Sequence, residues 1–192
     1  MPTRTTDVLT YSPMNENTII PVESGVLLVA RPDTLDPNFD RSVVFLLSHY
    51  SDSGSMGLII NRPSAGVIVD EDSPLVPWLA LTAEPSVPFV GGPVEPTGFI
   101  CMAPDESAGN GVSSVDIQNA DPLITARPFR LFHGYAGWDA GQLDAEIRGG
   151  GWFVVPSEPD DMFTSKPETL WNEVLARQPG DLGKLGRFYV DP

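Results

Sequence analysis

Short apolar runs separated by turn-forming residues dominate the first part of the chain. The runs 25–30, 42–49 and 56–61 are rich in β-branched and aromatic side chains. Continuous apolar runs of this length are typical of buried strands. A polar, glycine-containing segment, 50–55, joins the second run to the third, which predicts a β-hairpin. Similar runs predict further strands at 88–90, 99–103, 129–133 and 152–155, and a weak strand at 112–117.

A helical pattern follows the glycine-rich segment 134–138, which we interpret as a turn. Asp139 and Gln142 have capping-box spacing, so the Asp139 carboxylate is predicted to accept the free amides of the first turn. Asp144 and Arg148 are placed as an i,i+4 ion pair. The apolar face of this helix is predicted to carry three residues at i, i+3 and i+7: Ala140, Leu143 and Ile147.

A second capping box, Ser165 with Glu168, predicts another helix that ends near Arg177. Its apolar positions are Leu170, Trp171, Val174 and Leu175. A short helix is also predicted within 74–81. The chain after Gln178-Pro179-Gly180 is predicted to be a loop.

The pattern predicts a single α/β domain with a mixed, partly antiparallel β-sheet flanked by helices, because hairpins are present and a regular strand–helix alternation is not. Residues 1–20 are polar and are expected to form a loose N-terminal extension, with the domain covering 21–192. A chain of 192 residues has the length of one domain. With 41% hydrophobic and 19% charged residues, it has a globular composition.

The net charge narrows the choice of partners. Eleven basic against 26 acidic residues give a formal charge of −15, which repels nucleic acid and anionic membranes at long range. The chain also contains no run of Lys or Arg that would form a local basic groove. We therefore expect a protein or small-molecule partner and no direct nucleic-acid contact.

Cysteine use and hydropathy bear on the compartment. The single cysteine, Cys101, lies in the apolar run 99–102 and is expected to be a buried, inert thiol. The longest apolar runs, such as 26–30 and 43–47, are too short to cross a bilayer, and the N-terminus has no hydrophobic region of a secretory signal. These features predict a cytoplasmic protein that does not contact a membrane.

Known catalytic and cofactor-binding motifs are missing from the sequence. It has no Gly-x-Ser-x-Gly elbow, Walker A loop, dinucleotide fingerprint or EF-hand loop. Its two histidines, His49 and His133, and the single cysteine do not form a zinc-binding pattern. We expect no cofactor and no metal. Each histidine has two interpretations, a structural hydrogen-bonding role and a role as a general base.

The segment 134–138 also has two interpretations. Free amides ahead of a helix can bind an anion, but a carboxylate at Asp139 would occupy those amides. Tyr135 and Trp138 are expected to pack in the core or over it. Arg62, at the end of the hairpin, is either an anion clamp or the partner of an acidic side chain.

Five motifs, in order, give the chain a resemblance to the YqgE/AlgH family of bacterial proteins. They are Leu35-Asp36-Pro37-Asn38-Phe39 with Arg41-Ser42-Val43-Val44, Gly57-Leu58-Ile59-Ile60-Asn61-Arg62-Pro63, Gly91-Gly92-Pro93-Val94, Gly134-Tyr135-Ala136-Gly137-Trp138, and Gly141-Gln142-Leu143. The resemblance extends from about Gly25 to Ala176. It departs from the family pattern at His133, Asp139 and Asp144.

The resemblance implies a mixed α/β domain in the bacterial cytoplasm and no established reaction. One member is associated with regulation of alginate synthesis, which gave the family its label of transcriptional regulator. The acidic chain here contains nothing that resembles a DNA-binding helix.

We therefore predict a non-enzymatic binding or regulatory protein. The alternatives are a small-molecule hydrolase or transferase that uses a histidine as base, and a transcriptional regulator that contacts DNA. No catalytic residue is assigned. Because strand ends and turns usually carry binding sites, we predict that nine motif residues share one pocket: Asp36, Asn38, Arg41, Asn61, Arg62, Gly92, Tyr135, Trp138 and Gln142.

Overall fold

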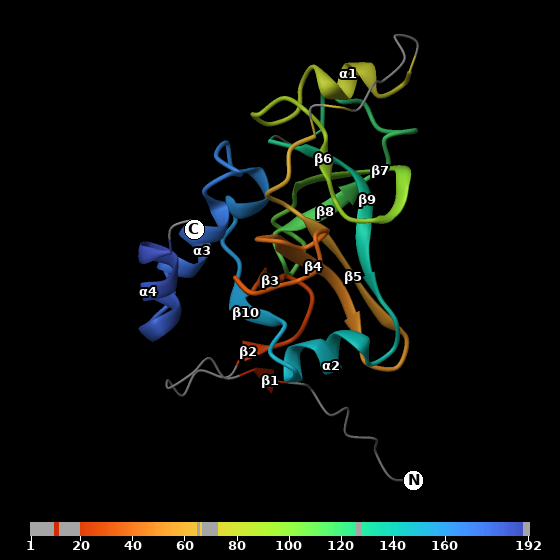
Figure 1. Ribbon diagram of the computed structural model, residues 1–192. Helices are drawn as coiled ribbons and strands as arrows, with labels where there is room; N and C mark the ends of the chain where they lie inside the picture. The colour runs from red at the N-terminus through yellow and green to blue at the C-terminus, as the bar shows by residue number, and fades with distance from the viewer. Residues whose placement is uncertain (1–9, 12–19, 65, 67–72, 126–127, 190–192) are drawn as a thin grey trace.

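The computed structural model describes residues 10–11, 20–64, 66, 73–125 and 128–189, and these form a β-sheet with helices on both faces (Figure 1). The strands are β1 (Thr10–Tyr11), β2 (Ile20–Pro21), β3 (Val26–Ala30), β4 (Val43–Tyr50), β5 (Gly54–Ile59), β6 (Phe89–Val90), β7 (Val94–Pro104), β8 (Val112–Val115), β9 (Arg130–Trp138) and β10 (Trp152–Pro156). The helices are α1 (Val76–Leu79), α2 (Gln142–Arg148), α3 (Leu170–Ala176), α4 (Gly180–Phe188) and the 3₁₀ turn η1 (Asp161–Phe163).

The main sheet is mixed and mostly antiparallel, as predicted. Its order is β10-β3-β4-β5-β9-β7-β8, and each neighbouring pair is antiparallel. β6 pairs with β9 in parallel. The predicted hairpin is confirmed as β4–β5, in which His49 faces Ser55, with a register shift between Leu46 and Ser48.

Strand alternation divides the core between the two faces of the sheet. On one face Leu28, Leu46 and Ile59 pack against Leu143 and Ile147 of α2. On the other face, the alternate strand residues pack against α3, whose buried side chains are the four predicted: Leu170, Trp171, Val174 and Leu175. The central strands are therefore buried on both sides, which explains why their sequences are continuously apolar.

The predicted turn at 134–138 is wrong, because β9 continues through it to Trp138. Gly134 has φ +66 and still belongs to the strand, and a Cβ there would lie 2.4 Å from the carbonyl oxygen of Gly92. The glycines therefore allow two backbones to approach closely, and the chain does not reverse there.

The predicted cap of the following helix is also wrong. α2 begins after Gly141, which has φ +70, and no side chain caps it. The reciprocal half of the box does form, because the Asp139 amide donates to Gln142 Oε1 at 3.0 Å. Ala140 is exposed, and Asp144 turns inward to His49. Tertiary packing thus decides the partners of these polar side chains.

The C-terminal part holds two further differences. The second capping box does not form, because α3 begins at Leu170 with Thr169 as its uncapped N-terminal neighbour. The predicted C-terminal loop is helix α4, which lies against α3 (Figure 1). Asn172 Nδ2 donates to the Gly186 carbonyl at 3.0 Å. A Cβ on Gly186 would lie 2.2 Å from the Ala176 amide nitrogen, so glycine permits this close helix contact.

The predicted N-terminal extension falls mostly outside the described residues. Of residues 1–19, the structure describes only β1, which pairs with β2. The domain boundary at residue 21 therefore stays a prediction. Among the described helices, none has the length and apolar character needed to cross a bilayer.

Candidate functional site

Three aromatic rings gather on the sheet face that α2 covers. Phe39 comes from the β3–β4 loop, Trp138 from the end of β9 and Trp152 from the start of β10. The Phe39 ring centroid lies 6.1 Å from Trp138 in a stacked arrangement and 5.3 Å from Trp152 in an edge arrangement. The two indoles lie edge to face at 6.0 Å. These separations are those of favourable aromatic pairs.

The carboxylate of Glu146, on α2, fixes the orientation of both indoles. Its Oε2 accepts hydrogen bonds from Trp138 Nε1 at 2.9 Å and Trp152 Nε1 at 2.8 Å. Its Oε1 accepts from Gln142 Nε2 at 2.9 Å. One side chain thus joins α2 to the ends of two strands, and both buried indole N–H groups are satisfied.

A pocket of about 400 Å³ lies between the β3–β4 loop and α2. The loop supplies Thr34, Leu35, Asp36 and Phe39. The opposite wall is formed by Gly137, Trp138, Gln142, Glu146, Gly151 and Trp152. Three of the nine predicted site residues, Asp36, Trp138 and Gln142, therefore meet in one pocket. We call this pocket the α2 pocket.

Three other predicted residues hold the loop in place behind the α2 pocket. Asn61 accepts from the Val43 amide at 2.8 Å and donates to the Arg41 carbonyl at 2.9 Å. Arg62 donates to the carbonyls of Asn38 and of Asp40, the latter at 2.8 Å. The amide of Asn38 closes an Asx turn on Asp36 Oδ1 at 2.8 Å.

The sequence leaves two roles open for Arg62, an anion clamp and the partner of an acidic side chain, and its hydrogen bonds correspond to neither. Its guanidinium donates to backbone carbonyls, while Asp40 and Asp36 lie close enough to act on it electrostatically. Burial lowers the pKa of Arg62, and these two carboxylates oppose that shift. The side chain therefore supports the loop.

The last three predicted residues lie away from the α2 pocket. Arg41, with φ +48, points to the opposite face, where its guanidinium lies 4.8 Å from the Tyr189 ring centroid. Gly92 packs against the β9 backbone, and a Cβ there would lie 2.2 Å from the carbonyl carbon of Tyr135. Tyr135 does not line the α2 pocket but a neighbouring cavity of about 440 Å³, which shares Gly137 and Trp138 with it.

The sequence prediction missed Phe39, Glu146 and Trp152 as pocket residues. Glu146 follows Gln142 by four positions, which places both on one helix face. That spacing was a usable signal. The sequence distance between Phe39 and Trp152 left no comparable signal, because only the folded sheet brings them together.

His49 lies between two potential partners on the same sheet face. Its Nδ1 is 2.8 Å from Ser55 Oγ, and its Nε2 is 3.2 Å from Asp144 Oδ1. The second contact is an ion pair only when His49 is protonated, and it lacks the alignment of a hydrogen bond. His133 is different: its Nε2 is buried without a hydrogen-bond partner among the described residues, and its ring lies 6.3 Å from Phe99.

Other reactive or charged groups are enclosed in the core. Cys101 is 1% exposed, which confirms the predicted burial, and burial raises the pKa of its thiol to about 12. Arg130, fully buried, donates to the carbonyls of Met162, Glu84 and Thr164. Burial lowers the pKa of Arg130 to about 10.

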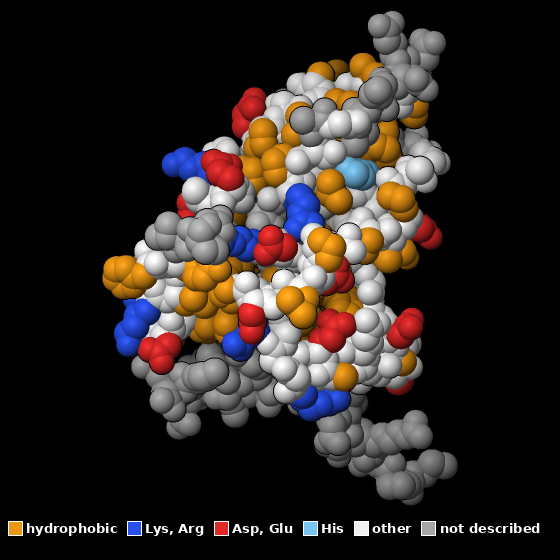
Figure 2. Space-filling model, in the orientation of Figure 1, with side chains coloured by type: hydrophobic (Ala, Val, Ile, Leu, Met, Phe, Trp, Pro, Cys, Tyr) orange, Lys and Arg blue, Asp and Glu red, His pale blue; other side chains and the backbone are white. Residues whose placement is uncertain are grey.

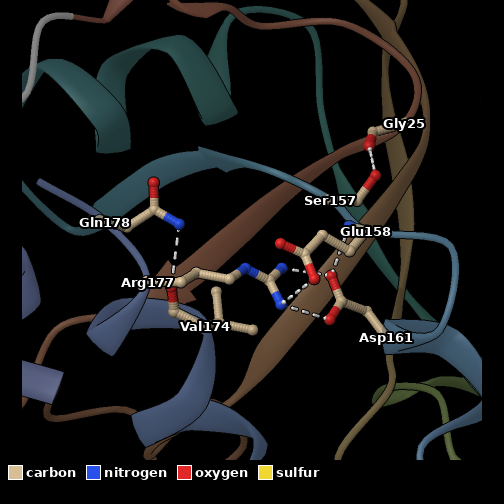
Figure 3. A network of polar contacts seen from close by, with 7 residues as sticks. All are labelled: Gly25, Ser157, Glu158, Asp161, Val174, Arg177 and Gln178. Carbon is tan, nitrogen blue, oxygen red and sulfur yellow. Dashed lines mark hydrogen bonds and ion pairs between the residues drawn. The ribbon is translucent and has the colours of Figure 1, made fainter. Parts of the chain in front are cut away.

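A polar network ties η1 to the end of α3 (Figure 3). Arg177 donates to both oxygens of Asp161 and lies 3.5 Å from Glu158. Burial opposes the charge of Arg177, but the hydrogen bond and the carboxylates raise its pKa overall. The network holds secondary structure together and presents no nucleophile. No cluster of three metal-binding side chains occurs within the described ranges.

Fold and pocket together define a class: an α/β protein with an eight-stranded main sheet and a pocket beside a short helix. The AlgH-like family model matches residues 27–183, so the chain belongs to the AlgH-like family. It is 39% identical to the UPF0301 protein of Thermobifida fusca over 188 residues, covering 88% of this chain and 93% of that protein. It is 40% identical to a UPF0301 protein of Streptomyces coelicolor over 184 residues, with the same coverages.

Solved structures support the same assignment. A crystal structure of a Corynebacterium diphtheriae protein matches with a TM-score of 0.75 and 26% identity, covering 86% of this chain and 92% of that one. The solution structure of the AlgH protein from Pseudomonas aeruginosa matches with a TM-score of 0.63 and 27% identity, covering 88% and 95%.

Proposed function

We propose that this protein is a non-enzymatic binding module of the cytoplasm, and that the α2 pocket is its binding site. The observation that carries the proposal is the meeting of Asp36, Trp138 and Gln142, from three separate motifs, in one lined cavity. Sites that bind small groups are commonly concave, aromatic-lined and supplied with a few placed polar groups.

The pocket is also preorganised. Glu146 fixes both indoles through their N–H groups, while Asn61 and Arg62 fix the loop that carries Asp36 and Phe39. A ligand that enters does not need to order these side chains, so little of its binding free energy is lost. Such a site is suited to recognition and contains no nucleophile paired with a base.

Native mass spectrometry tests the proposal, with protein purified from its own host. We expect a retained ligand or partner with the unmodified chain, and its loss with Phe39→Ala, which removes one wall of the pocket. Glu168→Gln, on an exposed residue outside the pocket, is the matched control and should retain the same mass. Equal retention by all three proteins would place the binding site elsewhere.

One observation favours a second candidate function, a hydrolase or transferase with His49 as base. Ser55, His49 and Asp144 have the order of a nucleophile, a base and an orienting carboxylate. In such a reaction Ser55 Oγ would attack an acyl or phosphoryl centre and pass its proton to His49 Nδ1. His49 would then protonate the leaving group, and water would release the product from Ser55.

Burial favours the binding function over this candidate. The side chains of His49 and Asp144 are only 8% and 9% exposed, on the sheet face that α2 covers. A fluorophosphonate probe decides the question. Labelling of Ser55 that is lost in His49→Gln and kept in His133→Gln would establish the enzyme. No labelling of Ser55 is the result expected for the binding module.

A further inference from the structure

The α2 pocket contains a carboxylate that pairs with no basic side chain of the part of the chain that the structure describes. Glu146 accepts three N–H groups, two from indoles and one from an amide, and all three donors are neutral. Within the described residues it makes no ion pair. Its negative charge is therefore held in a half-buried, aromatic-lined site, where the field of a charge is stronger than in open water.

Basic side chains near the α2 pocket are directed away from it. Arg31 lies 5.0 Å from the ring centroid of Phe153, a residue of the opposite face, and pairs with Asp33. Arg62 is engaged behind the loop by the carbonyls of Asn38 and Asp40. A second carboxylate, Asp36, lines the opposite wall of the pocket. The pocket thus combines aromatic rings with two carboxylates and no inward-facing cation among the described residues.

We propose that the α2 pocket receives the cationic side chain, Arg or Lys, of a partner protein. This inference rests on the proposed function and names its ligand class. Aromatic faces attract cations through their quadrupole, and carboxylates form short, strong hydrogen bonds with guanidinium and ammonium groups. The volume of about 400 Å³ accommodates one long side chain.

The rim of the pocket offers an apolar contact next to the two carboxylates, which a peptide can use. Leu35, at the edge of the pocket, is 98% exposed and is therefore available for contact with a partner. A peptide that places its basic side chain in the pocket would cover Leu35 with a neighbouring apolar residue. The net charge of −15 would attract a basic segment from a distance.

Nuclear magnetic resonance of the whole chain provides the test, since the indole N–H signals of Trp138 and Trp152 report directly on the pocket. The probes are acetyl-Leu-Arg-Leu-amide and its citrulline analogue, which has the same shape without the charge. A third probe, arginine amide, lacks the apolar neighbours. We expect the arginine peptide to shift both indole signals, and the citrulline peptide and arginine amide to bind about tenfold more weakly.

Two variants and one control complete the design. Glu146→Gln and Asp36→Asn each remove one pocket charge and should weaken binding of the arginine peptide by about tenfold. If Glu146→Gln disturbs the positions of the indoles, Asp36→Asn still tests the effect of the pocket charge. Glu168→Gln, an equal change of charge outside the pocket, should not weaken it.

The outcomes separate this inference from the proposed function. Equal binding of the arginine and citrulline peptides overturns the cation inference and leaves the pocket as a binding site. No shift with any probe also overturns it, while ligand retention by the unmodified chain and its loss in Phe39→Ala independently decide the proposed function. Equal binding of arginine amide and the peptide excludes a peptide partner.

Discussion

Glu146 illustrates how strongly one residue can organise its surroundings. It is the common acceptor for Trp138, Trp152 and Gln142, which belong to two strands and a helix. Its replacement leaves two nearly buried indole N–H groups without a partner, a situation that costs about 1–3 kcal/mol for each group. The residue therefore contributes to stability as well as to the pocket.

We predict that Glu146→Leu lowers the free energy of unfolding by about 2–4 kcal/mol in urea denaturation. Gln142→Ala, on an exposed residue, should cost less than about 1 kcal/mol. Equal losses in the two variants would show that the indole hydrogen bonds do not contribute as described.

Cys101 gives a second prediction. Because the thiol is buried and its pKa is raised to about 12, almost no thiolate is present at pH 8. Ellman's reagent should therefore react with the folded protein only over hours. It should react at once with protein unfolded in about 6 M guanidinium chloride, which unfolds most domains. Rapid reaction of the folded chain would contradict the burial.

For single residues, the sequence predicted burial better than it predicted hydrogen-bond and ion-pair partners. Apolar periodicity located buried Leu143, Ile147 and the four core residues of α3. The cap at Asp139 and the Asp144–Arg148 pair were wrong, because a polar side chain on a helix end has both local and tertiary partners. Asp144 is 7% exposed and faces His49, a choice that depends on where α2 docks.

The secondary structure is most predictable in the apolar strands and least predictable in the elements that contain glycine. The strands β3, β4, β5 and β10 follow from their apolar runs. The end of β9 was taken for a turn, and α4 for a loop, since glycine normally interrupts both kinds of element. Gly134 of β9, and Gly183 and Gly186 of α4, stand where another backbone approaches too closely for a Cβ.

The prediction of the binding site was limited in the same way, because motifs do not show which residues lie close to another backbone. Asp36, Trp138 and Gln142 came from separate motifs, and their meeting could be proposed from sequence. Gly92 was included because it belongs to a motif, although its place in the fold is a close packing contact. A motif indicates that a residue type is needed, and only the fold separates residues needed for packing from those that line a pocket.

Gly92→Ala tests that packing contact. The new Cβ would meet three backbone atoms of Tyr135 and Ala136 at 2.2–2.3 Å, and the φ of +154 already disfavours side chains. We expect a loss of at least about 2 kcal/mol in the free energy of unfolding.

Gly109→Ala is the matched control for that variant. No heavy atom lies within 4 Å of its added Cβ, so it should change stability by less than about 0.5 kcal/mol. A tolerated Gly92→Ala, measured by the same urea transition, would mean that the segment between β6 and β7 can move away from β9 at this point.

Across the whole molecule, charge is the property with the clearest consequence. Figure 2 shows that on one face the basic side chains are scattered among acidic and apolar ones and do not form a stripe. With a net charge of −15, phosphate contacts are opposed at long range.

We therefore predict no shift of double-stranded DNA in a gel at about 50 mM salt, where electrostatic binding is strongest. A retarded band that disappears as salt is raised would support the transcriptional regulator alternative. A regulatory role that acts through contact with another protein is compatible with the absence of such a band.

The β3–β4 loop reaches both faces of the sheet. Phe39 packs among the indoles of the α2 pocket, and Arg41 lies over the rings of Trp171 and Tyr189 on the other side. Only Asp40 separates them, and its carbonyl is held by Arg62. Consecutive residues of one loop thus contact both faces of the sheet, and Arg62 holds the backbone between them. An occupant of the α2 pocket that displaces Phe39 is therefore expected to change the contact of Arg41 with Trp171 and Tyr189 on the opposite face.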